Sequence, residues 1–255
     1  HEMNELLEIV GLDVSFPSQH GTTYAVRDVS INLKPGEVLG VVGESGAGKS
    51  TLGNAVINLL EPPGKITNGK VLFQGENISG LDDKEMRDIR GQKIGMIFQD
   101  PLTSLNPLMT IGTQLLETIA KTTKLGGNAA FKKAIELLEA VGIEQPAGRF
   151  RAYPHEFSGG MRQRVVIALA LAGDPDLIIA DEPTTALDVS IQEQILELLR
   201  VLCRERQLGV IIITHDIGVI ANIADRVAVM YDGSVVETGE VRQILMAPKH
   251  EYTKS

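Results

Sequence analysis

The sequence of 255 residues predicts an α/β fold in which a parallel-sheet core carries an antiparallel β subdomain and an inserted α-helical subdomain. Three observations predict this fold class. Short, almost entirely apolar runs at residues 177–180 and 210–213 are typical of strands buried on both faces of a parallel sheet. Alternating apolar and polar residues near the start indicate half-buried strands, and residues 101–154 change to the spacing of amphipathic helices.

The antiparallel layer is predicted at the start of the chain. Residues 6–14 and 26–33 have the pattern of strands, and the polar residues 18–22 between them favour a loop. Asn68-Gly69 is a hairpin-turn signal, which predicts a turn before a further strand at residues 71–73.

The parallel core begins with a strand at residues 38–42, a nearly all-apolar run that ends in a glycine-rich loop. Apolar residues at helical spacing follow that loop and predict a helix; they are Leu52, Ala55, Val56, Leu59 and Leu60. The order strand, glycine loop, helix is the first sign of a phosphate site.

The helical subdomain is predicted as an insertion at about residues 101–165 within one domain that spans residues 1–255. One of its helices ends at Gly142, and its apolar face is made of Phe131, Ala134, Ile135, Leu138 and Val141. A further amphipathic helix at residues 191–202 separates the two buried strands, and residues 227–237 form a closing hairpin around Asp232-Gly233.

Composition narrows the functional classes. The formal charge of −9 without a cluster of Lys and Arg argues against a nucleic-acid partner. Cys203 is the single cysteine, so no intramolecular disulfide can form, and with five scattered histidines no Cys/His metal-ligand spacing arises. The longest apolar runs are far shorter than the roughly 20 residues of a membrane-spanning helix.

The phosphate-binding loop is the strongest motif of the sequence. It fits the pattern GxxxxGKS and consists of Gly43, Glu44, Ser45, Gly46, Ala47, Gly48, Lys49 and Ser50, with Thr51 next in the helix. Its glycines let backbone N–H groups point at phosphate oxygens, reinforced by the positive end of the helix dipole. Lys49 would add a positive charge for the β and γ phosphates of ATP, and Ser50 would offer a hydroxyl to Mg²⁺. A glycine loop of no function is rejected because both flanks are correct.

Two carboxylates, Asp181 and Glu182, follow the buried strand at residues 177–180. The carboxyl edge of an open α/β sheet is where such folds place their chemistry. Asp181 would hold Mg²⁺ through water, and Glu182 would orient and deprotonate the attacking water. An Asp-Glu pair alone is more often a solvated loop start, so this interpretation depends on the phosphate loop.

At Phe157-Ser158-Gly159-Gly160-Met161-Arg162-Gln163 the chain resembles the ABC ATPases, because these residues are similar to the signature motif of that family. The serine and both glycines are intact, whereas Phe157 and Met161 replace the commoner Leu and Gln. The resemblance extends along the chain and assigns further residues: Gln99 to the Q-loop, as a catalytic residue and Mg²⁺ ligand, Asp188 to the D-loop, His215 to the switch histidine, and Phe16 to the adenine platform, with Tyr24 as its alternative.

The resemblance implies a RecA-like P-loop NTPase fold, ATP and Mg²⁺ as cofactors, and ATP hydrolysis coupled to transport. Ser158, Gly159 and Gly160 would then contact the γ phosphate of the ATP bound to a second ATPase subunit, and His215 would contact the same phosphate. Other implied partners are transmembrane permease subunits and an extracytoplasmic substrate-binding protein. The implied location is the cytoplasmic face of the inner membrane, as a peripheral subunit.

A narrower resemblance points to the ATPase subunits of bacterial dipeptide, oligopeptide and nickel importers. It rests on residues 99–107, on residues 153–156 and on the ending near residues 250–253. That family continues from His-Pro-Tyr into a C-terminal segment, whereas Glu251 stands in place of the proline here, so we expect a natural extension beyond Ser255. The segment after Gln99 is where family members meet the permease loops, with Leu105 and Leu108 as candidate contacts.

Two other functions are alternatives to a transport ATPase. A DNA-repair or chromosome-maintenance ATPase has a very long coiled coil between phosphate loop and signature, whereas a modest helical insert separates Ser50 from Ser158 here. A P-loop switch or kinase of another class has no need of Ser158-Gly159-Gly160. Transport, and import of peptides within it, is therefore the predicted function, and the transported substrate itself leaves no mark on the sequence.

Overall fold

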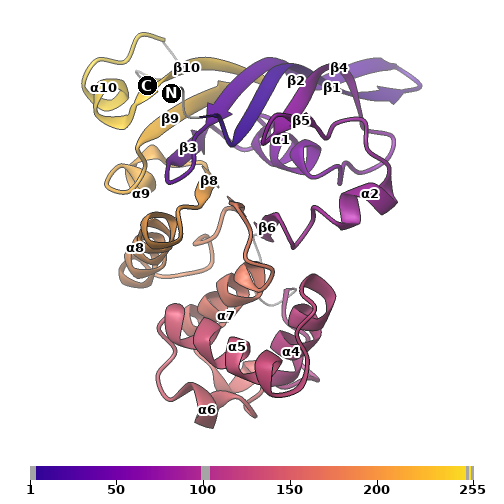
Figure 1. Cartoon of the computed structure of the whole chain (residues 1–255). Coiled ribbons are helices and arrows are strands. Elements are labelled where there is room, and N and C mark those ends of the chain that lie inside the picture. The colour runs from indigo at the N-terminus through magenta and orange to yellow at the C-terminus, as the bar shows by residue number, and fades with distance from the viewer. Residues whose placement is uncertain (1–3, 99–103, 251–252, 254–255) are drawn as a thin grey trace. The chain divides into compact units, whose positions relative to one another are not determined.

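The structure is a computed structural model that describes residues 4–98, 104–250 and 253. The chain divides into two compact units, and Figure 1 labels their helices and strands. The first unit consists of His1–Arg87 and Arg200–Ser255, and the second of Asp88–Leu199. Each unit contains strands and helices of its own.

An antiparallel sheet opens the first unit. Its strands are β1 (Leu7–Ser18), β2 (Gly21–Leu33), β4 (Lys65–Phe73) and β5 (Glu76–Asn77), in the order β2-β1-β4-β5. The predicted strands are present, but β1 and β2 extend further than expected, and only Gln19 and His20 lie between them. Ser18 closes this tight turn, because its Oγ donates to the carbonyl oxygen of Gly21 at 2.9 Å.

The predicted hairpin turn at Asn68-Gly69 is wrong. β4 runs through both residues and pairs with β1 on either side of them. Gly69 has φ +80, and a Cβ there would overlap the carbonyl oxygens of Val10 and Gly11, where the pairing shifts register. The left-handed conformation that favours Asn-Gly in turns therefore serves a β-bulge here.

The parallel sheet of the first unit has β3 (Val38–Val42) between β8 (Gly209–Thr214) and β9 (Arg226–Tyr231), both parallel to it. β10 (Ser234–Glu240) pairs antiparallel with β9 through the predicted Asp232-Gly233 turn, with φ +48 and +84 at these two residues. All residues of β3 and β8 are buried, which explains their continuous apolar sequence.

Short helices complete the first unit: α1 (Lys49–Val56), α2 (Asp83–Arg87), α9 (Ile217–Ile220) and α10 (Val241–Met246). The helix after the glycine loop is shorter than predicted, since it ends at Val56 and Asn58 takes a left-handed conformation with φ +56. Leu59 and Leu60 thus lie outside it, and Leu59 is 41% exposed.

Cys203 is buried in the first unit. Its Sγ donates to the carbonyl oxygen of Leu208 at 3.0 Å. Burial raises the pKa of the Cys203 thiol to about 11, and the nearby Arg204 guanidinium opposes this only in part. The thiol is therefore protonated at neutral pH.

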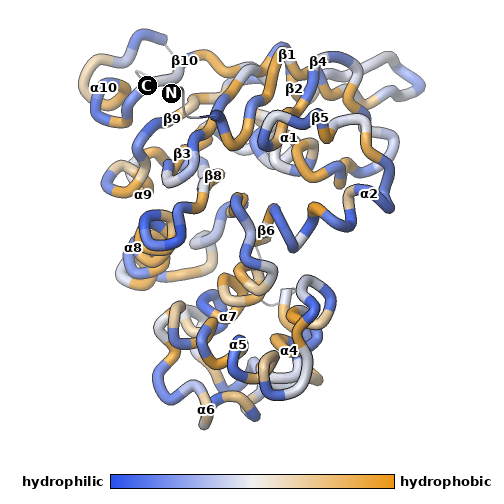
Figure 2. Tube along the Cα trace, viewed as in Figure 1, coloured by the Kyte–Doolittle hydropathy of each residue, from blue (hydrophilic) through white to orange (hydrophobic). Residues whose placement is uncertain are grey.

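The second unit contains a parallel pair of strands, β6 (Ile94–Ile97) and β7 (Leu177–Asp181). Helical elements occupy the described residues between them: α4 (Ile111–Thr122), α5 (Gly127–Ala140), α6 (Pro146–Arg149), η1 (Pro154–Glu156) and α7 (Gly159–Leu171). α8 (Val189–Arg206) follows β7 and continues past Leu199 into the first unit. In Figure 2, hydrophobic stretches alternate with hydrophilic ones along α4 and α5, as expected for helices with one buried face.

α5 bears out most of its predicted apolar face, in which Ile135 is half-buried. Ala134, Leu138 and Val141 are buried, and Gly142 ends the helix with φ +83. Phe131, predicted as part of that face, is instead 44% exposed, and its ring packs edge to face on Phe150 at a centroid distance of 5.0 Å. Phe131 is the fifth residue of α5, at the start of its second turn.

Across the part of the chain that the structure describes, no helix is both long enough and apolar enough to cross a membrane.

Candidate functional site

The phosphate loop lies between β3 and α1, as the motif requires. Gly43 follows directly on Val42, and α1 begins at Lys49 after Gly48, which has a left-handed conformation with φ +95. A Cβ on Gly43 would overlap the carbonyl oxygen of Met230, and a Cβ on Gly48 would overlap that of Ala25. Both positions therefore need glycine because neighbouring backbone approaches closely.

Lys49 lies inside this loop. Its ammonium group donates to the carbonyl oxygens of Gly43 at 2.6 Å and Glu44 at 2.8 Å, and the residue is only 6% exposed. The rim is open by contrast, because Glu44, Ser45, Gly46 and Ser50 are exposed. The loop thus holds a buried positive charge beneath a solvent-facing rim at the N-terminus of α1, an arrangement suited to a phosphate chain.

Backbone contacts from the hairpin at residues 232–233 fix the far side of the loop. The Gly233 N–H donates to the carbonyl oxygen of Ala47 at 3.0 Å, and the Gly233 carbonyl accepts from the Arg27 N–H at 2.8 Å. Ala47 is itself buried. The β9–β10 hairpin and β2 therefore support the loop from below its rim.

Two aromatic residues are candidates for the adenine platform. Phe16 in β1 is half-buried, and a Cβ on Gly64 would come within 2.7 Å of the Phe16 ring, so the ring lies against the Gly64 backbone. Tyr24 in β2 is 41% exposed, and the Arg27 guanidinium lies 5.8 Å from the centre of its ring. Both stay candidates on these contacts.

His215 lies beside the start of the phosphate loop. A cavity of about 400 Å³ in the first unit is lined by His215 and Asp216 after β8 and by Gly43 and Glu44 of the loop. Asp216 caps the short helix α9, since its Oδ1 accepts from the Gly218 N–H at 2.9 Å. The structure thus brings the predicted histidine together with the predicted phosphate loop.

The two carboxylates follow β7 in the second unit. Asp181 is the last residue of β7 and Glu182 the first beyond it, with a left-handed φ of +48. Glu182 Oε2 accepts a hydrogen bond from Thr185 Oγ1 at 3.0 Å. A left-handed glutamate is strained, and strained residues of this kind persist where the surroundings hold them and gather at functional sites.

Asp188 ends the turn after Glu182 and caps α8. Its Oδ1 accepts from the Ile191 N–H at 3.0 Å, and its carbonyl oxygen accepts from the Gln192 N–H at 2.8 Å. The residue that the family resemblance assigns to the D-loop therefore also has a local structural role.

The predicted signature segment starts α7. Ser158 is the N-cap, with its Oγ accepting from the Met161 N–H at 3.2 Å, and Gly159 and Gly160 form the first turn. A Cβ on Gly160 would lie 2.8 Å from Ile191 Cγ2, so α8 passes close by. This helix start offers backbone N–H groups and a hydroxyl of the kind that binds anions.

Sequence reasoning missed two glutamines that hold the turn after Glu182. Gln163 in α7 is fully buried, and its Nε2 donates to the Pro183 carbonyl oxygen at 2.7 Å. Gln192 in α8 donates from Nε2 to the carbonyl oxygens of Thr184 at 3.1 Å and Leu187 at 3.0 Å. Gln163 stands in the quoted signature segment, but no local pattern reveals which turn it would bind.

Gln99, predicted as a catalytic residue and Mg²⁺ ligand, lies outside the described residues. The remaining predicted residues fall into two sets. The first unit carries the phosphate loop, His215 and Phe16, and the second carries Asp181, Glu182, Asp188 and Ser158 with its glycines.

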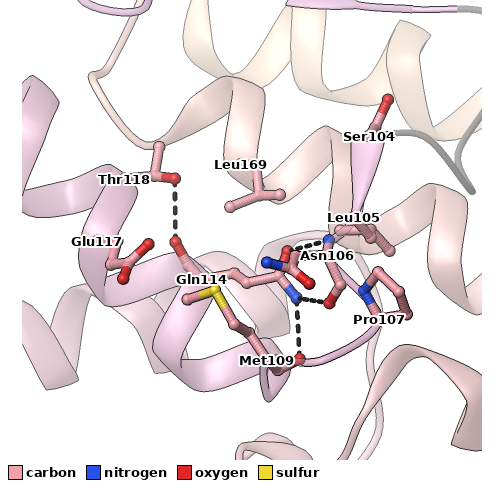
Figure 3. A pocket seen from close by; sticks show the side chains of 9 residues that line it. All are labelled: Ser104, Leu105, Asn106, Pro107, Met109, Gln114, Glu117, Thr118 and Leu169. Atoms are coloured by element: carbon pink, nitrogen blue, oxygen red, sulfur yellow. Dashed lines mark hydrogen bonds between the residues drawn. The ribbon is translucent and has the colours of Figure 1, made fainter.

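A second cavity, of about 460 Å³, lies in the second unit (Figure 3). Gln114 of α4 organises its rim: Oε1 accepts from the Asn106 N–H at 2.9 Å, and Nε2 donates to the carbonyl oxygens of Asn106 at 2.9 Å and Met109 at 3.0 Å. Leu108, which lies between Asn106 and Met109, is 84% exposed. Leu105, which precedes Asn106, is only 3% exposed. The loop thus presents Leu108 to solvent and tucks Leu105 inside.

Comparison with known proteins adds a family and relatives. Residues 26–185 match the family described as ABC transporter. The chain is 54% identical over 252 residues to the oligopeptide transport ATP-binding protein OppD of Bacillus subtilis strain 168, covering 98% of this chain and 70% of that protein. It is 46% identical over 252 residues to the dipeptide transport ATP-binding protein DppD of Escherichia coli K12, covering 98% and 76%.

Solved structures agree with this match. The ATP-binding cassette MJ0796, solved as a dimer in a post-hydrolysis state with ADP and Pi, has a TM-score of 0.80 at 34% identity and covers 92% of this chain and 99% of its own. cbiO1 from Clostridium perfringens, part of the ABC transporter complex cbiONQ, has a TM-score of 0.83 at 29% identity, with 96% and 92% covered.

Proposed function

Because the chain belongs to the ABC transporter family, we propose that it is the ATP-hydrolysing subunit of an importer for di- and oligopeptides. The observation that carries the ATPase part is the phosphate loop, in which Lys49 is buried beneath an open rim at the start of α1. The relatives named as dipeptide and oligopeptide transport ATP-binding proteins support the substrate class.

In this proposal the first unit binds the nucleotide. The N–H groups of residues 44–51 surround the phosphates, and Lys49 turns its ammonium from the Gly43 and Glu44 carbonyls toward them. Phe16 stacks on adenine, with Tyr24 as the alternative. His215, which lines the same cavity as Gly43, contacts the γ phosphate.

Hydroxyl and carboxylate oxygens are the ligands that Mg²⁺ prefers, and Ser50 and Asp181 supply them in this proposal, with Gln99 as a third ligand. The metal ion would neutralise charge on the β and γ phosphates. Ser50 fits this role because it is exposed on the rim, next to Lys49.

Glu182 acts as the general base of the proposed reaction. Its carboxylate takes a proton from the water that attacks the γ phosphorus, while the bond to the leaving β-phosphate oxygen breaks. Thr185 Oγ1 holds one carboxylate oxygen and so restricts the side chain. The products are ADP and phosphate.

A second ATPase subunit completes each site in the proposal. The start of α7, with Ser158 as its cap, would donate N–H groups to the γ phosphate bound by the partner. The dimeric state of the solved cassette with ADP and Pi supports this arrangement. Asp188 would lie near the same nucleotide.

Permease subunits are the membrane partners, and we place the chain on the cytoplasmic face of the membrane beside them. The exposed Leu108 beside the cavity of Figure 3 suits an apolar permease segment, and the exposed Glu117 that lines the cavity suits a basic residue. An extracytoplasmic substrate-binding protein would deliver the peptide. The whole chain is one ATPase domain in this proposal, with the helices of about residues 101–165 as its insertion.

A DNA-repair or chromosome-maintenance ATPase is not favoured. The relatives compared above are transport proteins. Such an ATPase has a very long coiled coil between the phosphate loop and the signature. The helices in this region are short: α4 spans Ile111–Thr122 and α5 spans Gly127–Ala140.

Reconstitution of the chain with its permease subunits in proteoliposomes tests the proposed function. ATP on the side of the chain should drive uptake of labelled di- and oligopeptides, and the Glu182→Gln variant should abolish uptake while the complex still assembles. ATP-dependent uptake of another solute class, with no uptake of peptides, would overturn the substrate assignment.

A further inference from the structure

Gln163 is a fully buried amide in α7 that the mechanism above does not use. Its Nε2 donates to the Pro183 carbonyl oxygen at 2.7 Å, and its Oε1 is buried without a hydrogen-bond partner among the described residues. The nitrogen must face Pro183, because a carbonyl oxygen only accepts, so the orientation of the amide is fixed. An amide that leaves one atom unsatisfied costs free energy, and an apolar side chain of equal size would avoid that cost.

The hydrogen bond of Gln163 reaches the carbonyl oxygen of Pro183, the residue directly after Glu182. Glu182 has φ +48, a conformation that needs support from its surroundings. Pro183 cannot provide that support through its own nitrogen, because proline has no N–H. The Pro183 carbonyl oxygen can still accept a hydrogen bond, and such a bond from a neighbouring element holds the turn in place.

Gln192 holds the same turn from the other side. Its Nε2 donates to the carbonyl oxygens of Thr184 and Leu187, at 3.1 and 3.0 Å. Thr185, which donates to the Glu182 carboxylate, lies between these anchored residues. Side-chain amides from α7 and α8 thus fix the backbone that places Thr185 Oγ1, and with it Glu182 Oε2.

We propose that Gln163 is a positioning residue that sets the orientation of the Glu182 carboxylate through the Pro183 carbonyl. This inference rests on the proposed role of Glu182 as general base. The residue does not touch substrate; it keeps the turn at 182–185 in the conformation that aims the carboxylate. Its loss lowers the rate of hydrolysis without lowering the affinity for ATP, which the phosphate loop of the first unit provides.

The test uses the full chain with Gln163→Met, which keeps the size of the side chain and removes the N–H donor. We expect kcat for ATP hydrolysis to fall roughly 10- to 100-fold, the scale of a misplaced catalytic group. The Kd for ATP, measured with EDTA so that hydrolysis stops, should stay unchanged. Gln163→Asn keeps the amide but shortens its reach, and it should likewise lower kcat while the Kd for ATP stays unchanged. This variant replaces Gln163→Met in the test if Gln163→Met does not fold.

A double-mutant comparison separates positioning from a structural role. Gln163→Met in the Glu182→Gln background, followed by single-turnover hydrolysis, should cost about twofold or less, because the group that it positions is already gone. Ile167→Val is the matched control: it removes a buried methyl group one turn further along α7 and should lower Tm while leaving kcat unchanged.

The outcomes are distinct. An unchanged kcat in Gln163→Met, or an equal fold-loss with and without Glu182, would overturn the positioning role while leaving Glu182 as the base. Undiminished hydrolysis by Glu182→Gln alone would overturn the proposed base and this inference with it.

Discussion

Lys49 Nζ lies 2.6 Å from the carbonyl oxygen of Gly43, the residue with which the phosphate loop begins. A lysine that is 6% exposed thereby has its charge satisfied by the backbone of its own loop. In the proposed function, Lys49 holds the loop before ATP binds and contacts the phosphates afterwards.

Lys49→Ala should weaken ATP binding by about 10- to 100-fold, the range expected when a hydrogen bond to a charged group is lost. Equilibrium titration with ATP measures this directly. Lys34→Ala, which changes an exposed lysine of the same unit, is the control and should bind ATP normally. Tight nucleotide binding by Lys49→Ala would count against the phosphate loop as the binding site.

Phe16→Ala tests the adenine platform. Loss of stacking should raise the KM for ATP by a contribution of about 1 kcal/mol and leave kcat little changed. Because the Phe16 ring lies against Gly64, a purely structural role would instead lower Tm with KM unchanged. Tyr24→Ala is the matched variant, and a rise in KM there but not in Phe16→Ala would move the platform to Tyr24.

Local sequence patterns predicted most of the parallel strands, although not β6 (Ile94–Ile97). The apolar runs at residues 38–42, 177–180 and 210–213 became β3, β7 and β8, because burial on both faces demands continuous apolar residues. Asn68-Gly69 misled for a different reason. The dipeptide encodes a left-handed backbone, and only the pairing of β4 with β1 decides that this backbone forms a bulge and not a turn.

The candidate site also has parts that the sequence predicts and parts that it does not. The phosphate loop and the helix start at Ser158 are contiguous motifs, so their local geometry follows from their residues. The contacts of Gln163 with Pro183 and of Gln192 with Leu187 join residues from separate elements. Such contacts depend on how α7, α8 and the turn pack together, which a single sequence does not display.

Leu108 tests the proposed permease contact. Leu108→Asp places a charge on a side chain that is 84% exposed, so the ATPase activity of the chain alone should be unchanged while peptide transport by the assembled complex falls. Met246→Asp, at a position that is 85% exposed in α10, should affect neither assay. Leu105 is buried, so a substitution there would disturb folding as well as any permease contact. An equal loss of ATPase activity and of transport is therefore expected only for substitutions of Leu105.

Cys203 should resist alkylation in the folded protein. Burial raises the pKa of its thiol to about 11, so at pH 8 the thiolate that reacts with iodoacetamide is scarcely present. Mass spectrometry should find the native chain unmodified under conditions that fully label it in urea. The unfolded thiol ionises at the ordinary pKa of 9.0, whereas the folded thiol ionises only near a pKa of about 11. The contribution of this group to the free energy of unfolding therefore falls as the pH rises from 9.0 to about 11. Rapid native labelling at pH 8 would show that the thiol is accessible.

In the proposed mechanism, ATP is hydrolysed at a site that two subunits complete together. Lys49 and Ser158 belong to different units of the chain. In the proposal, each ATP lies between Lys49 of one subunit and Ser158 of the second subunit. A group supplied in trans to a phosphoryl-transfer site is worth about 10³ to 10⁵ in rate in other enzymes, so a monomer should be nearly inactive. ATP in the interface should favour the dimer, and hydrolysis should release it.

The shared site is tested by measuring specific ATPase activity against protein concentration, with sedimentation of the same samples. Activity per protomer should rise in step with the dimer fraction, and Glu182→Gln with ATP should sediment as a dimer. Adding Ser158→Arg to that variant should abolish the dimer while ATP still binds. Activity per protomer that stays constant on dilution, in samples that sediment only as monomers, would contradict the shared site.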